Sequence, residues 1–141
     1  KLSLQRLPPK PTNTQATFAN GNVLLTPGKV FKELGGFPVG FRHSLADLFF
    51  TGRATRAGTP LVVAPGFQGY CEQGPARESW SNPGLTLVER FKHVNHPKGL
   101  PAREWVPFAL RFGGITGVAY ALRPYLFIVL KHLSLRRVPH S

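Results

Sequence analysis

Methionine is absent from this sequence, and cysteine occurs once, at Cys71. A single cysteine excludes an internal disulfide framework, so the chain is not a small secreted domain held together by disulfide bonds. The surrounding stretch GYCEQG gives no indication of an activated thiolate, and we interpret Cys71 as a structural or incidental residue. Because the chain begins at Lys1 and lacks methionine, we expect a mature protein from which an initiator segment has been removed.

Carboxylates are scarce as well: six Asp and Glu stand against 18 Lys and Arg, for a net charge of +12. The scattered acids offer no pair for acid-base catalysis, and the sequence contains no G-x-S-x-G, no Walker loop and no G-x-G-x-x-G. We therefore expect a protein that is not an enzyme by itself and has no cofactor of its own. The excess of positive charge indicates a polyanionic partner, either RNA phosphate or anionic lipid headgroups.

No carboxylate occurs from Lys1 to Lys32, whereas lysine and arginine recur there. This bias is typical of sequence next to an organellar transit peptide. We expect an imported mitochondrial protein; the alternative is a truncated chain.

Glycine and proline are abundant, at 15 and 14 residues, which favours turns and extended segments over long regular elements. The predicted fold class is mostly α and irregular, with an extended Pro/Gly-rich N-terminal arm, short helices, and one kinked transmembrane helix near the C-terminus. The predicted divisions are an extended basic arm at 1–25, partner-ordered short helices and loops at 26–101, a single transmembrane helix with its flanks at 102–135, and a basic tail at 136–141.

Short elements within 26–101 are predicted from caps and apolar spacing. The first helix has Thr26 as its N-cap and Pro27 as its first residue, packs through Val30, Phe31 and Leu34, and ends at Gly35–Gly36. The second is capped by Ser44 and packs through Leu45, Leu48 and Phe49. The third starts at Asn82–Pro83 with Leu85, Val88 and Phe91 on one side, and Pro60–Gly66 is either an extended segment or an edge strand.

The longest apolar stretch is FGGITGVAYALRPYLFIVL, from Phe112 to Leu130, which as a helix would rise roughly 28 Å, close to the thickness of a bilayer core. Arg123 inside it would cost about 2.5–3.5 kcal/mol at the centre of a bilayer, but its long side chain can reach toward the interface. Pro124 predicts a kink. We favour a membrane span over a buried soluble helix, and place third a helix lying on the membrane surface, because the charges fall mostly outside the apolar run.

Small residues recur at every fourth position in this segment, at Ala109, Gly113, Gly117 and Ala121. Such a stripe lets the backbone of a neighbouring helix approach closely. Each glycine in a helix costs roughly 1 kcal/mol relative to alanine, so Gly113, Gly114 and Gly117 would be a poor choice for a soluble core helix. Close packing against a neighbouring helix gives these glycines a role. We predict a helix-packing surface at these four positions.

Basic residues lie within and around the apolar segment and are predicted to contact lipid headgroups, such as those of cardiolipin: Arg111, Arg123, Lys131, Arg136 and Arg137. His93 and His96 have a spacing that could hold a metal, but no further ligands complete a site, so no metal is predicted.

The basic start, the proline-broken arm and the stretch FGGITGVAYALRPYLFIVLKHLSLRR together resemble the small single-pass supernumerary subunits of mitochondrial inner-membrane respiratory complexes. The resemblance is architectural and strongest over 103–137. It implies a structural, assembly and lipid-binding role beside other subunits, with NADH:ubiquinone oxidoreductase favoured as host and the ATP synthase and cytochrome complexes as alternatives. A mitochondrial ribosomal protein that binds rRNA is the alternative of another class.

Overall fold

The computed structural model describes residues 4–70, 79–82 and 84–135 of the 141-residue chain. The fold consists of two compact units, one within residues 3–72 and one within residues 73–141. The prediction of a mainly helical chain with a long apolar helical stretch near its C-terminus is confirmed.

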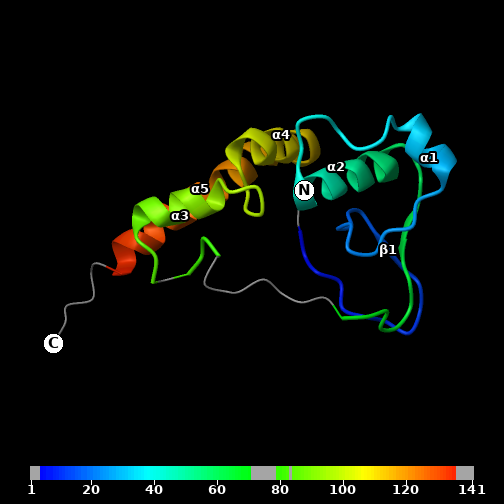
Figure 1. Cartoon of the computed structure of the whole chain (residues 1–141), viewed down its shortest axis with the longest axis horizontal. Coiled ribbons are helices and arrows are strands. Elements are labelled where there is room, and N and C mark those ends of the chain that lie inside the picture. Colours follow the sequence, from blue (N-terminus) through cyan, green and yellow to red (C-terminus); the bar gives the residue numbers. More distant parts are fainter. Residues whose placement is uncertain (1–3, 71–78, 83, 136–141) are drawn as a thin grey trace. The chain divides into compact units, whose positions relative to one another are not determined.

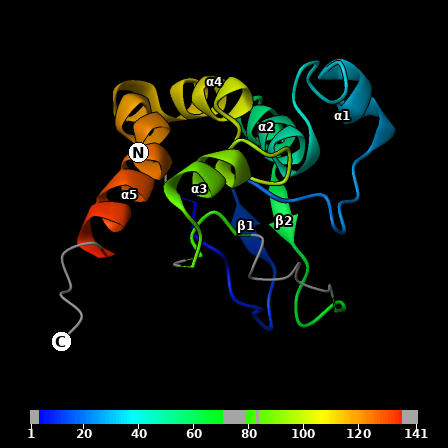
Figure 2. The same ribbon diagram turned by 60° about the vertical axis from the view of Figure 1, so that its left-hand side comes forward.

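A two-stranded antiparallel sheet lies in the first unit and joins segments far apart in the sequence (Figure 2). Strand β1, Thr14–Ala16, pairs with β2, Leu61–Val63, so that Thr14 faces Val63 and Ala16 faces Leu61. The strand alternative for the apolar run after Pro60 is therefore the observed one. β1 falls within 1–25, so part of the predicted arm pairs inside the chain.

Helix α1, Gly28–Glu33, begins one residue later than predicted, because Pro27 occupies the N-cap position that the sequence assigned to Thr26. It ends in two glycines with left-handed backbones, since Gly35 and Gly36 both have φ of 69°, a conformation that glycine adopts without steric cost. Phe31 packs its ring 5.5 Å from the rings of both Phe37 and Phe50. This aromatic cluster joins α1 to α2.

Helix α2, His43–Arg56, supplies the centre of the same unit through buried Leu45, Phe50, Thr51 and Ala54. The helix starts one residue before the predicted cap, because Arg42 occupies the N-cap position and Ser44 lies inside. Thr51 accepts a hydrogen bond from the Ala19 backbone N–H at 3.0 Å. This bond ties the segment after β1 to α2.

Helix α3, Leu87–Val94, opens the described part of the second unit. Its N-cap is Thr86, whose hydroxyl accepts from the Glu89 N–H while the Glu89 carboxylate accepts from the Thr86 N–H, a reciprocal capping box. The predicted start at Asn82–Pro83 is thus four residues too early. The predicted packing side is also wrong, since Val88 is 64% exposed and the buried residues of α3 are Arg90 and Val94.

The apolar segment is divided into three elements: α4, Ala102–Gly113, the 3₁₀ turn η2, Gly114–Thr116, and α5, Gly117–Leu135. The interruption lies at Gly114, whose φ of 55° and ψ of −134° are not helical, whereas α5 continues through Pro124, where the sequence placed a kink. Helices α3 and α4 both pack against α5 (Figure 1). Side chains from all three form the core of this unit: Val94, Trp105, Phe108, Ala109, Ala121 and Ile128.

Candidate functional site

The chain folds back on itself between α4 and α5, and this reversal shapes the candidate site. The Trp105 indole N–H donates to the Tyr120 carbonyl at 3.2 Å, although the two residues are 15 positions apart. A straight helix would separate such positions by about 22 Å. The two helices therefore lie against each other rather than end to end.

Two of the four predicted helix-packing residues, Ala109 and Gly117, meet at this contact. A Cβ atom built on Gly117 would stand 2.5 Å from the Ala109 carbonyl oxygen, so only glycine allows this approach. Ala121 is buried as well, while Gly113, the last residue of α4, is partly exposed.

Backbone carbonyl groups of two loops contact side chains in the second half of α5. The Tyr125 hydroxyl donates to the Leu100 carbonyl at 2.9 Å, and the Lys131 ammonium donates to the Ser81 carbonyl at 3.1 Å. Trp80 packs edge-on against Phe127 with 5.8 Å between the rings. The loops on either side of α3 are therefore held against α5.

The opposite side of α5 is apolar and open. Leucines recur there at three- and four-residue spacing, with 51% exposure at Leu122 and 65% at Leu130. A contiguous apolar surface of this kind marks a contact with protein or membrane. The exposed large aliphatic residues on this side of α5 are Val118, Leu122, Leu126, Val129, Leu130 and Leu133, called the outward face below.

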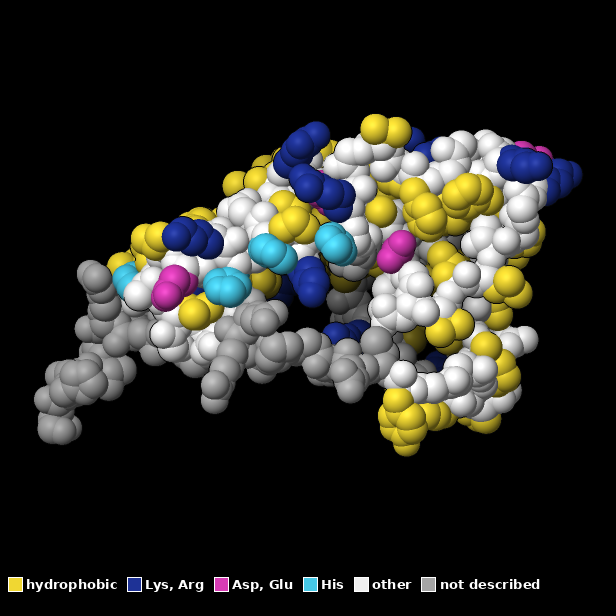
Figure 3. Space-filling view, in the orientation of Figure 1, with side chains coloured by type: hydrophobic (Ala, Val, Ile, Leu, Met, Phe, Trp, Pro, Cys, Tyr) yellow, Lys and Arg dark blue, Asp and Glu magenta, His cyan; other side chains and the backbone are white. Residues whose placement is uncertain are grey.

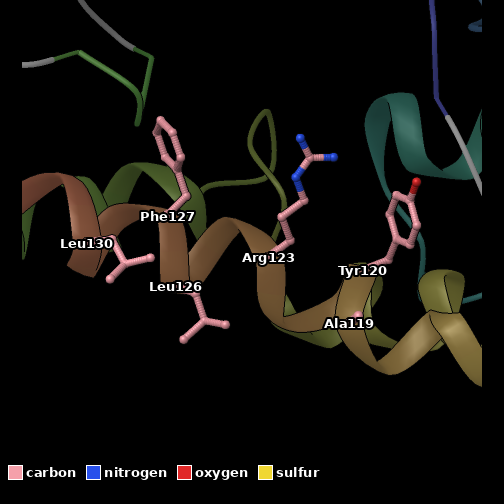
Figure 4. Close-up of a pocket in the computed structure, with 6 residues that line it drawn as sticks. All are labelled: Ala119, Tyr120, Arg123, Leu126, Phe127 and Leu130. Atoms are coloured by element: carbon pink, nitrogen blue, oxygen red, sulfur yellow. The ribbon is translucent and has the colours of Figure 1, made fainter.

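An open groove follows the edge of the outward face, and its lining includes Arg123 (Figure 4). Leu126 and Leu130 point to one side of α5 in this view, whereas Tyr120, Arg123 and Phe127 point to the other. A cation and two aromatic rings therefore lie beside a row of leucines. In the described part of the chain no carboxylate forms an ion pair with Arg123.

The other predicted headgroup residues do not gather at one point. Arg111 is exposed near the end of α4, and Lys131 is half-buried, with its ammonium 5.4 Å from the centre of the Phe127 ring. Arg136 and Arg137 lie outside the described residues. Of the three predicted headgroup residues that the structure describes, Arg123 alone lines the groove.

Among the described residues, no group of three or more His, Cys, Asp or Glu side chains is close enough to hold a metal ion. His96 Nδ1 instead accepts from the Lys98 N–H at 3.3 Å, a local loop contact. Cys71 falls outside the described residues.

Three features of the site were missed by sequence reasoning. The spacing of Leu122, Leu126, Leu130 and Leu133 is itself a signal of one helix face, hidden because the whole segment is apolar. The sequence Thr86-Leu-Val-Glu89 is a capping-box signature that fixes where α3 begins. A third feature is the burial of Glu104 in α4, which is 2% exposed. No pattern in the sequence indicates that this carboxylate would be buried.

By length and composition, the helical stretch Ala102–Ser134 could cross a membrane, and 22% of its most apolar window is buried inside the structure. No protein family, curated protein or solved structure matches this chain.

Proposed function

We propose that this chain is a non-catalytic accessory subunit of a mitochondrial inner-membrane respiratory complex, with α5 as the element that contacts the membrane. The open outward face of α5 is the observation that carries the proposal. It leaves six large aliphatic side chains 38–65% exposed along one helix, which water would solvate poorly and acyl chains would cover.

The role of such a subunit would be structural: to support assembly and to bind anionic phospholipid such as cardiolipin. Net charge of +12 and the groove at Arg123 favour an anionic lipid over a neutral one. Partner subunits of the complex would order the chain further, and it would bring no cofactor of its own.

A mitochondrial location is supported by the sequence, in which Lys1–Lys32 is basic and free of carboxylates. Among the inner-membrane complexes, NADH:ubiquinone oxidoreductase is the favoured host, and the ATP synthase and the cytochrome complexes are the alternatives. The sequence predicts a single crossing of that membrane by the segment 102–135.

Membrane fractionation tests this proposal. We expect the chain to sediment with the membranes of lysed mitochondria, and to migrate with a respiratory complex on a native gel. A matrix enzyme and a core membrane subunit serve as markers for the two fractions. Release of most of the chain into the supernatant, with co-sedimentation on the mitochondrial ribosome, would replace the proposal by the rRNA-binding alternative.

A further inference from the structure

The side of α5 that faces away from the leucines is covered along most of its length. The contact residues Gly117, Ala121, Pro124 and Ile128 are all buried, and they follow one another at three- and four-residue spacing. Helix α4 packs on the first part of α5, and α3 with its loops follows along the second. One side of α5 therefore packs against α3 and α4, and its outward face is exposed.

The covering segments are too polar to enter a bilayer with α5. The Leu100 carbonyl bonds to Tyr125, which lies about 12 Å along the helix axis from Gly117, near the middle of any span. The loop that ends at Leu100 exposes Asn95, His96 and Lys98. Irregular backbone facing lipid does not occur within the hydrocarbon core, because its polar groups have no water to bond.

The unit is therefore polar on the α3 side and apolar on the outward side of α5. Figure 3 shows basic, histidine and acidic side chains over the region of α3, which lies in front of α5 in that view. Exposed Glu89 and Lys92 belong to this polar side of α3. Such a two-sided unit matches the boundary between water and lipid, not the inside of a bilayer.

We infer that α5 lies along the surface of an anionic phospholipid bilayer, with its outward face in the acyl chains and α3 toward water. This inference rests on the membrane role proposed above and changes its geometry from a crossing to an in-plane contact. A helix in this position sinks roughly 5–10 Å into the boundary of headgroups and acyl chains.

Arg123 is placed for a lipid phosphate in this arrangement. It leaves α5 at the edge of the leucine row, on the same side as Tyr120 and Phe127 (Figure 4). Aromatic and cationic side chains prefer the headgroup level, where the ring is half-solvated and the guanidinium meets phosphate. The charge that would be costly in a crossing helix becomes an attachment to an anionic headgroup.

Thiol labelling at the two ends of α5 tests the inference. In the full chain with Cys71→Ser, Thr116→Cys and Ser134→Cys are made singly, and each protein is bound to phosphatidylcholine vesicles containing cardiolipin. A membrane-impermeant maleimide added outside should label both positions to a similar extent. Labelling of only one position until detergent opens the vesicles would establish a crossing and overturn the inference.

A pair of matched substitutions tests which surface meets the lipid. Leu126→Glu places a charge on the outward face, and Val88→Glu places the same charge on the polar side, at a position that is also more than half exposed. We expect the first to weaken vesicle binding by about tenfold or more and the second to leave it unchanged. Equal effects, or no binding of the unaltered chain to these vesicles, would mean that the outward face takes a protein instead.

A second pair of substitutions tests whether the charge of Arg123 contributes to the choice of lipid. Arg123→Leu should abolish the preference for cardiolipin vesicles over pure phosphatidylcholine, while Lys92→Leu, an equal loss of charge on α3, should retain it. An unchanged preference in Arg123→Leu would overturn the headgroup role. These vesicle results stand apart from the subunit proposal, which fails only if the chain does not accompany a membrane complex in mitochondria.

Discussion

At the scale of single residues, Gly117 decides how closely α4 and α5 approach each other. Its backbone lies so near α4 that an added Cβ would meet the Ala109 oxygen at 2.5 Å and the Leu110 Cα at 2.9 Å. Both are backbone atoms, which cannot move aside as a flexible side chain can. The approach of two helices is thus decided by the absence of one methyl group.

We predict that Gly117→Leu separates α4 from α5 and lowers the free energy of unfolding by about 1–3 kcal/mol or more. Ile115→Leu is the matched control, because Ile115 is 98% exposed and the new side chain meets solvent. Urea unfolding followed by circular dichroism measures both. Equal stability of the two variants would show that the glycine is not needed for this packing.

Among the elements, α3 owes its start to side-chain chemistry rather than to apolar spacing. The Thr86 hydroxyl and backbone N–H both bond to the Glu89 carboxylate, at 2.7 and 2.8 Å. These bonds hold the pKa of Glu89 below its ordinary value, with the hydroxyl as the larger cause. The charged carboxylate therefore stabilises the folded helix.

The pH dependence follows from the direction of that shift. A depressed carboxyl pKa contributes stability that is present above its ordinary value and is lost as the pH falls through the folded-state pKa. We expect Thr86→Ala to raise the pKa of Glu89 toward 4.5 and Thr86→Ser to keep it low. Carboxyl NMR titration measures this, and an unchanged pKa in Thr86→Ala would contradict the capping role.

Helix α5 is the element with two different sides. Its inner side uses small and buried residues, and its outward face uses leucine and valine. In a segment that is apolar throughout, composition cannot separate these sides, because both are made of hydrophobic residues. The two sides differ because α3 and α4 cover the inner side of α5 and leave the outward face exposed.

For the whole molecule, the division into two units means that each unit depends on its own buried core for stability. In the described part of residues 3–72, the buried hydrophobic side chains are Leu45, Phe50 and Ala54, a small core. The buried residues of α3 belong with α4 and α5 in the other unit. A fragment that ends before α4 keeps the small core and loses the larger one.

We therefore predict that the isolated segment Lys1–Lys98 shows little cooperative thermal unfolding and rapid amide exchange, whereas the full chain unfolds with a measurable heat-absorption peak. Differential scanning calorimetry of the two proteins makes the comparison. A sharp transition in the segment would show that residues 3–72 form a stable domain without the rest.

Much of the local structure could be predicted from sequence because it depends on neighbouring residues. Pro27 and the glycine pair Gly35–Gly36 bound α1 close to the expected positions, since proline and left-handed glycine act within one turn. Helix α3 begins after Thr86, where the capping box with Glu89 is also a local signal, and not at the Asn-Pro pair four residues earlier.

The sequence by itself determined the apolar character of the segment after Phe112, its basic surroundings and its stripe of small residues, because composition and spacing are properties of the chain alone. Only the tertiary structure decided that the helix breaks at Gly114 and that Ala109 meets Gly117 within one chain. The physical reason is that hydrophobicity does not specify a neighbour. A leucine and a close-packed alanine are equally apolar, and what covers each one depends on where the chain turns back.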